Sequence, residues 1–109
     1  MKLASNQRKF LEAMANQMDP IVRVGKNGLE AKIISSISEA LNSHELIKIK
    51  ILDSSPNEAD EVAEEAIKAT KAILVRIIGR VIILYKPFEE NAKSKPNYQR
   101  KNQLDHTES

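Results

Sequence analysis

The chain has 109 residues, of which 41% are hydrophobic, and it contains no cysteine. A chain of this length buries one modest core, and the lack of cysteine excludes a disulfide framework. No apolar run has the length of a membrane span or the character of a secretory signal peptide. We therefore expect a cytoplasmic protein without membrane contact that folds as one domain followed by a tail.

The formal net charge of +2 does not by itself indicate a nucleic-acid partner, so the distribution of charge along the chain matters more. Residues 57–71 contain five acids and two lysines, whereas residues 72–86 contain three cations and no acid. Two interpretations are open. The protein is either a dipole that orients on a polyanion or a fold with ordinary solvated faces of opposite charge.

A helix and a strand are predicted at the N-terminal end. Ser5 is a candidate N-cap for a helix whose apolar residues recur at helical spacing, namely Phe10, Leu11, Met14 and Met18. Residues 20–24 are rich in β-branched side chains, so they are predicted to form a strand with Pro20 at its first position.

A glycine loop follows this strand, with the sequence Gly25-Lys26-Asn27-Gly28. A second helix is predicted after the loop from apolar residues at positions 33, 34, 37, 40 and 41. Beyond it, isoleucines at 47, 49 and 51 alternate with two lysines. This period of two indicates a strand with one apolar face and one basic face.

A third helix is predicted to begin within Ser55-Pro56-Asn57-Glu58, because the tetrapeptide combines a hydroxyl N-cap, a proline start and a glutamate three residues later. Its core stripe comprises Ala59, Val62, Ala63, Ala66, Ile67 and Thr70. Two apolar strands, 73–78 and 81–85, are separated only by Gly79 and Arg80, which predicts a type II′ hairpin.

Large apolar residues almost disappear after residue 86, so we interpret residues 1–86 as the folded domain and 87–109 as a flexible polar tail. The element order α-β-α-β-α-β-β predicts a two-layer α/β fold with a mixed four-stranded sheet and helices mostly on one face. The apolar character of the last two strands indicates that part of the other face is also covered.

The glycine loop has the residue types of a phosphate-binding loop. Gly25 and Gly28 permit positive φ and close backbone approach, and the helix that follows offers N–H groups with partial positive charge. Lys26 adds a cation and Asn27 an amide. Taken alone, the pattern is weak and favours a plain connection between strand and helix, because Asn-Gly is a common turn dipeptide.

The loop is one of four segments that together resemble a known family. These segments are Gln7-Arg8 in the first helix, residues 20–29, residues 45–50 and residues 78–86. In this order they are similar to the CRM domain (chloroplast RNA splicing and ribosome maturation), in the single-domain form of the bacterial YhbY family of ribosome-associated proteins. The chain departs from many relatives at Glu30, where a hydroxyl residue that could cap the second helix is replaced by an acid.

The resemblance implies a fold like the C-terminal domain of bacterial translation initiation factor three, with strand order 1-2-4-3. It also implies binding to ribosomal RNA and association with the precursor large ribosomal subunit in the bacterial cytoplasm. No reaction, cofactor or small-molecule substrate is attached to the family, and we expect a monomer.

We expect nine residues to contribute to the RNA-binding surface. Lys26 is the principal candidate for a phosphate contact, and the remaining cations flank the loop. The full set is Gly25, Lys26, Asn27, Gly28, Arg23, Arg8, Lys9, Lys32 and Arg80. The cations Lys48, Lys50 and Arg76 are interpreted as the solvent face of the sheet. Since the chain has only four aromatic residues, recognition of backbone and shape is expected rather than base stacking.

The sequence contains no recognisable catalytic or metal-binding constellation. His44 and His106 are its two histidines, and they lie in a predicted loop and in the tail. The glycine loop lacks the patterns of nucleotide-hydrolysing and dinucleotide-binding loops. We therefore expect a protein that is not an enzyme. The alternative function is a protein-interaction module that recruits a partner through the acidic third helix, with Glu61, Glu64 and Glu65.

Overall fold

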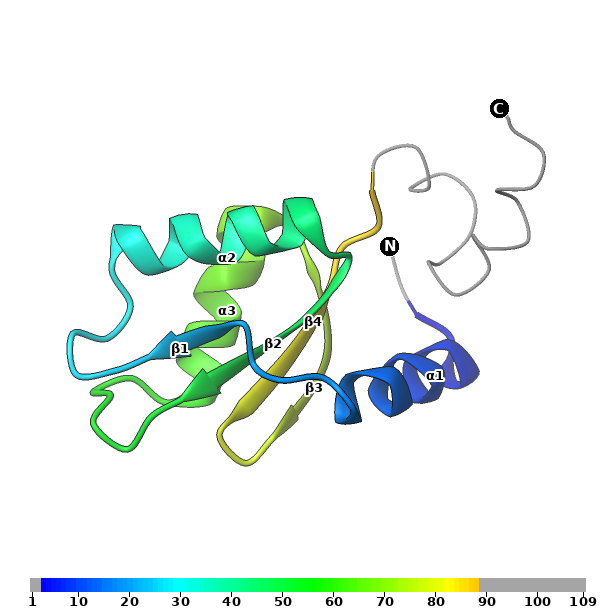
Figure 1. The fold of residues 1–109 in the computed structure, drawn as a ribbon, viewed down its shortest axis with the longest axis horizontal. Coiled ribbons are helices and arrows are strands. Elements are labelled where there is room, and N and C mark those ends of the chain that lie inside the picture. The colour runs from blue at the N-terminus through cyan, green and yellow to red at the C-terminus, as the bar shows by residue number, and fades with distance from the viewer. Residues whose placement is uncertain (1–2, 89–109) are drawn as a thin grey trace.

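The structure is a computed structural model that describes residues 3–88. It contains three helices and four strands (Figure 1): α1 Ser5–Asn16, β1 Val22–Val24, α2 Ala31–Ser43, β2 Leu46–Ile51, α3 Ala59–Thr70, β3 Ile73–Ile78 and β4 Val81–Tyr85. The predicted α/β fold class and element order are confirmed. Of the predicted tail, residues 89–109 lie outside the described part of the chain.

The four strands form one mixed sheet in the order β1-β2-β4-β3. β1 is parallel to β2, whereas β4 is antiparallel to both β2 and β3. The mixed sheet and the strand order 1-2-4-3 are therefore confirmed. Because β1 and β2 run in the same direction, the loops that follow them emerge at the same end of the sheet (Figure 1).

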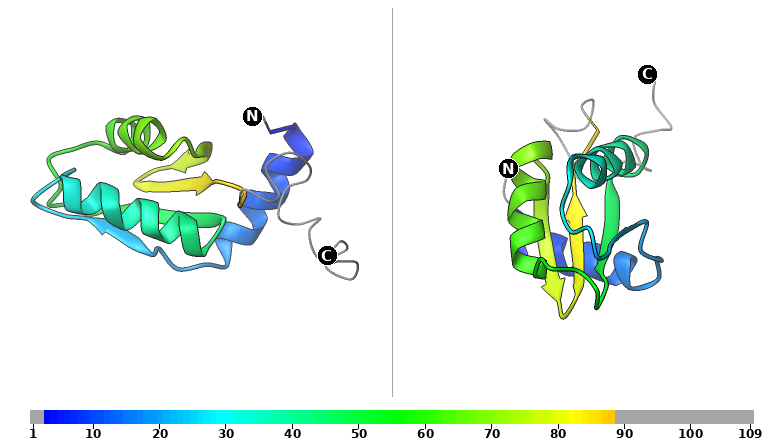
Figure 2. Two further views of the ribbon diagram at one scale, coloured as in Figure 1. Left: turned by 90° about the horizontal axis from the view of Figure 1, so that it is seen from above. Right: turned by 90° about the vertical axis from the view of Figure 1, so that its left-hand side faces the viewer.

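The helices cover the two faces of the sheet unequally. α2 and α3 pack on the face that presents Ile47, Ile49 and Ile82, which are fully buried. α1 packs on the opposite face against residues such as Leu46 and Tyr85. It lies at the end of the sheet away from the loop that joins β1 to α2 (Figures 1 and 2). Only part of this second face is covered by a helix.

The burial of the strands follows this arrangement. In β2 the predicted alternation is present, with buried isoleucines and half-buried Lys48 and Lys50. The alternation fails at Leu46, which is also buried because α1 covers its face. β4 is a central strand near α1, so four consecutive residues, 82–85, are buried on both faces.

The beginning of α1 differs from the prediction. The N-cap is Ala4 rather than Ser5, and the N–H of Ala4 donates to Oε1 of Gln7 at 2.9 Å. Phe10 was expected in the core but is 41% exposed, because it lies beside the buried stripe formed by Leu11 and Ala15. The helix itself is confirmed.

The beginning of α3 also differs, since its N-cap is Glu58 and not Ser55. Oγ of Ser55 accepts a hydrogen bond from the N–H of Asn57 at 3.0 Å, which closes a local turn instead of opening a helix. The capping box is formed three residues later, where the N–H of Glu58 donates to Oε1 of Glu61 at 2.8 Å. The predicted core stripe of α3 is confirmed as buried or half-buried.

The predicted hairpin is confirmed between β3 and β4. Gly79 has φ of 58°, the left-handed value that the first central position of a type II′ turn requires. One irregularity interrupts the ladder, because the pairing shifts by one residue between Leu74 and Arg76. Val75 is therefore the extra residue of a β-bulge in this edge strand.

Candidate nucleic-acid interface

The glycine loop forms a tight turn at the end of β1. The N–H of Gly28 donates to the carbonyl of Gly25 at 2.8 Å, and Lys26 and Asn27 are exposed at the tip. Gly28 has φ of 66°, whereas Gly25 does not have positive φ. Of the two glycines that permit positive φ, only Gly28 adopts it.

The loop that joins β2 to α3 supports the glycine loop. The N–H of Leu29 donates to Oδ1 of Asn57 at 2.9 Å. A Cβ on Gly28 would lie 2.4 Å from this oxygen and 2.9 Å from Cγ of Pro56, so only glycine fits here. Sequence reasoning missed Asn57, because its partner is 28 residues away in the chain and no local pattern indicates the contact.

The N-terminus of α2 lies directly after the glycine loop. Glu30 is its N-cap, and the carboxylate makes no capping hydrogen bond, as expected from the loss of a hydroxyl at this position. The backbone N–H groups of Ala31 and Lys32 have no acceptor within residues 3–88. These two donors, with the exposed amines of Lys26 and Lys32, form a surface suited to an anion.

Two other predicted site residues lie near this end of the sheet. Arg23 is exposed at the centre of β1, two residues before the loop. Arg80 lies in the hairpin turn, and its guanidinium forms an ion pair with Asp53 in the β2–α3 loop. Its carbonyl accepts a hydrogen bond from the N–H of Ile51 at 2.8 Å. The hairpin and the β2–α3 loop are thus neighbours.

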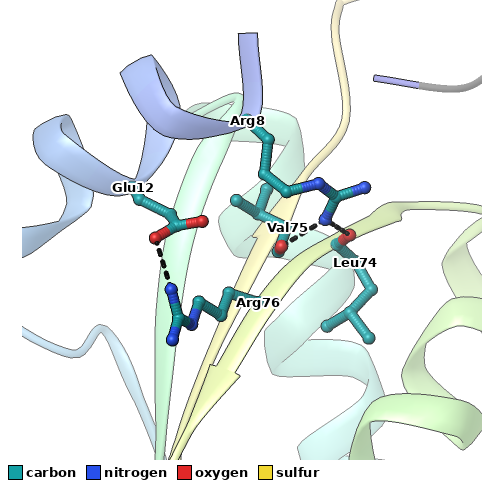
Figure 3. Close-up of polar contacts among 5 residues, drawn as sticks. All are labelled: Arg8, Glu12, Leu74, Val75 and Arg76. Carbon is teal, nitrogen blue, oxygen red and sulfur yellow. Dashed lines mark hydrogen bonds and ion pairs between the residues drawn. The ribbon is translucent and has the colours of Figure 1, made fainter. Parts of the chain in front are cut away.

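Arg8 and Lys9 lie on α1, and the structure does not bring them to the glycine loop (Figure 1). Nη1 of Arg8 donates to the carbonyl of Leu74 at 3.0 Å and also to that of Val75 (Figure 3). The half-buried guanidinium therefore contacts the bulge of β3. Lys9 is exposed on the same helix.

A hollow of about 330 Å³ lies beside the interface, between the β2–α3 loop, the start of α3 and the hairpin. Three acids and one arginine are among the residues that line it: Asp53, Glu58, Asp60 and Arg80. Because acids predominate there, the hollow is unfavourable for phosphate, which is better accommodated on the side of Lys26.

The acids of α3 are engaged in stabilising their own helix. Glu61 closes the capping box, and the carboxylates of Glu64 and Glu65 each lie 3.8 Å from Nζ of Lys68. Acids at the N-terminus of a helix and pairs at this spacing are favourable to the helix. Most of the acidic surface thus has a structural explanation.

Residues 3–88 hold no group of three or more His, Asp or Glu side chains that could bind a metal ion. No helix in this range is long and apolar enough to cross a membrane. His44 is the exposed C-cap of α2, and His106 lies outside the range.

Relatives with similar sequences are named as RNA-binding proteins. The "Probable RNA-binding protein YqeI" of Bacillus subtilis is 39% identical over 89 residues, which cover 82% of this chain and 93% of the relative. An RNA-binding protein of Haemophilus influenzae is 36% identical and covers 81% of this chain and 89% of its own length. Both alignments span nearly the whole of the relative.

The solution structure of a hypothetical protein of Staphylococcus aureus has a similar fold. It superposes with a TM-score of 0.69 at 33% identity, covering 87% of this chain and 99% of the other. The family model of the CRS1/YhbY (CRM) domain matches residues 3–86, which include all the helices and strands that the structure describes. The chain therefore belongs to the CRS1/YhbY (CRM) domain family.

Proposed function

We propose that this protein is a non-catalytic RNA-binding protein that associates with precursor large ribosomal subunits in the bacterial cytoplasm and assists their assembly. The glycine loop is its principal contact with the RNA backbone. The main support for this role is the place of exposed Lys26 beside the N-terminus of α2. Two backbone N–H groups there have no acceptor within residues 3–88. The RNA-binding relatives support the class of ligand.

In this proposal a phosphate of the RNA accepts hydrogen bonds from the N–H groups of Ala31 and Lys32. The amine of Lys26 supplies the countercharge, and the amide of Asn27 donates to the same phosphate or to its neighbour. The exposed carboxylate of Glu30 repels phosphate and restricts its approach to the Lys26 side. Binding therefore needs no covalent step.

Contacts to backbone and shape are proposed rather than stacking on bases. Tyr85 is fully buried, and Phe10 lies on α1, away from the glycine loop. A stacking platform needs exposed rings at the contact surface, and residues 20–32, which include the glycine loop, contain no aromatic residue.

The salt dependence of binding tests the role of the loop. The affinity for a transcribed fragment of large-subunit ribosomal RNA should fall steeply with salt, because bound phosphates release counterions. Lys26→Ala should weaken binding and reduce the slope of log Kobs against log salt by about one unit. Lys68→Ala, at an exposed position on α3, is the matched control and should change little.

Two results would contradict this proposal. RNA affinity that does not change with salt concentration would exclude contacts with phosphates as its source. Equal effects of Lys26→Ala and Lys68→Ala would mean that the loop has no special role. Association with the assembly intermediate is tested by gradient sedimentation, in which the protein should migrate with precursor large subunits and not with mature ones.

A further inference from the structure

The uncovered part of the α1 face of the sheet forms a second cationic surface. The strand register places Arg23 opposite Lys50, Lys50 opposite Val81 and Val81 opposite Ile78, in one row across all four strands. The next row contains Lys48, which pairs with Ile83 of β4. We call Arg23, Lys48, Lys50, Val81 and Ile78 the basic strand face.

The cations of this face are not neutralised. No ion pair joins Arg23, Lys48 or Lys50 to an acid within residues 3–88. Nζ of Lys48 donates to the carbonyl of Met18 at 3.1 Å, which holds the amine at the surface without removing its charge. At the border with α1, Arg76 is paired with Glu12 at 3.1 Å (Figure 3).

The spacing of these cations is set by the sheet. Lys48 and Lys50 lie two residues apart on one strand, which separates their Cα atoms by about 6.6–6.8 Å. Arg23 is on the neighbouring strand, about 4.8 Å away in the hydrogen-bonding direction. Three cations on a rigid plane can therefore contact more than one phosphate of a polynucleotide at the same time.

We propose that the basic strand face is a second RNA-binding surface, which holds a further stretch of the backbone of the RNA bound at the glycine loop. This inference rests on the proposed function and extends it. Arg23 links the two surfaces, because it lies on this face and is two residues from Gly25. Ile78, which is 44% exposed, and Val81 offer apolar contacts to riboses at the far side of the row.

Charge complementarity and continuity favour RNA over an acidic protein segment as the occupant. The face is continuous with the glycine loop, after which the free N–H groups at the start of α2 suit phosphate. The acidic hollow is lined by the start of α3, and α3 packs on the opposite face of the sheet. A single RNA that passes from the loop along β1 and across to β2 reaches every unpaired cation of the face.

The double variant Arg23→Gln/Lys50→Gln tests this inference with transcribed large-subunit ribosomal RNA. It should lower affinity on the order of tenfold at low salt and reduce the salt slope by about 1.4–1.8 units, the expectation for two lost phosphate contacts. The control Lys68→Gln/Lys71→Gln removes the same charge from exposed positions at the end of α3 and should leave the slope unchanged. The charge-conserving variant Arg23→Lys/Lys50→Arg should bind RNA about as tightly as the wild type. Thermal denaturation should confirm that all variants fold.

The possible results distinguish a failure of this inference from a failure of the proposed function. Suppose that the wild type binds RNA with steep salt dependence and that Lys26→Ala weakens binding. If Arg23→Gln/Lys50→Gln then binds RNA as tightly as its control variant, the role of the basic strand face is refuted, while the role of the glycine loop stands. If the wild type shows no salt-dependent RNA binding, both the proposed function and this inference are refuted. If poly-glutamate competes as effectively as RNA, the face is a general site for acidic polymers and the assignment to RNA is wrong.

Discussion

Gly28 links the chemistry of the candidate interface to its stability. Its positive φ turns the chain from β1 into α2, and its missing side chain leaves room for Pro56 and Asn57. The hydrogen bond from Leu29 to Asn57 then joins the two loops. Contacts within the protein therefore hold the base of the glycine loop, and such preorganisation lowers the entropy cost of binding a ligand.

Gly28→Ala should destabilise the fold by about 2 kcal/mol or more, because the left-handed conformation is costly for alanine and the new Cβ would collide with Asn57 and Pro56. Gly25→Ala is the control, because a Cβ there would lie 3.7 Å from the nearest side-chain atoms and Gly25 does not have positive φ. Urea denaturation of the two variants measures the difference. Equal free energies of unfolding for the two variants would contradict this prediction, because they would show that Asn57 and Pro56 move away from the new Cβ without loss of stability.

At the scale of elements, α1 is attached to the sheet by a small apolar cluster and by Arg8. The helix contributes Leu11 and Ala15 to this cluster, and the guanidinium of Arg8 donates hydrogen bonds to two carbonyls of β3 (Figure 3). The resemblance placed Arg8 in the RNA-binding set, and the structure adds a local role for it. Polar contacts of this kind make Arg8 a candidate for holding α1 in place.

Arg8→Met should lower the free energy of unfolding by about 1.5–3 kcal/mol, the typical contribution of hydrogen bonds to a charged group. Lys9→Met, at the exposed neighbouring position, should have little effect. Chemical denaturation together with RNA titration of both variants distinguishes two roles. A loss of RNA affinity in Arg8→Met with unchanged stability would assign the guanidinium to phosphate instead.

Element types could be predicted from the sequence because hydrophobic periodicity is local. The alternation in β2, the stripe of α3 and the two-residue hairpin each occupy a short window. The start of α3 was misplaced because Asn57 bonds to Leu29 instead of entering the helix. The partners of Arg8 lie 66 and 67 residues away, and no pattern in its own helix indicates them.

At the scale of the whole molecule, opposite charges are segregated. The basic strand face and the glycine loop present unpaired cations, whereas α3 presents acids on the other side of the sheet. Such a distribution produces a field that orients a polyanion before contact. This segregation depends on which strands become neighbours, so the net charge of +2 could not reveal it.

Glu64→Gln/Glu65→Gln separates the two functions considered for this chain. RNA affinity should be retained or rise slightly, because the substitutions remove repulsion far from the proposed contacts. Stability should change little, since the pairs with Lys68 are exposed. RNA titration checks the first expectation, and co-purification checks the alternative. Loss of a protein partner with intact RNA binding would support recruitment through α3, and loss of RNA binding would contradict the proposed orientation.

The bulge at Val75 lies in an edge strand, where copies of a protein can pair with one another. An edge strand with free carbonyls is a template on which another chain can add a strand and begin to aggregate. In β3 the bulge interrupts the regular ladder, and Arg8 occupies the carbonyls of Leu74 and Val75. We therefore expect the contact that attaches α1 also to disfavour self-association at this edge.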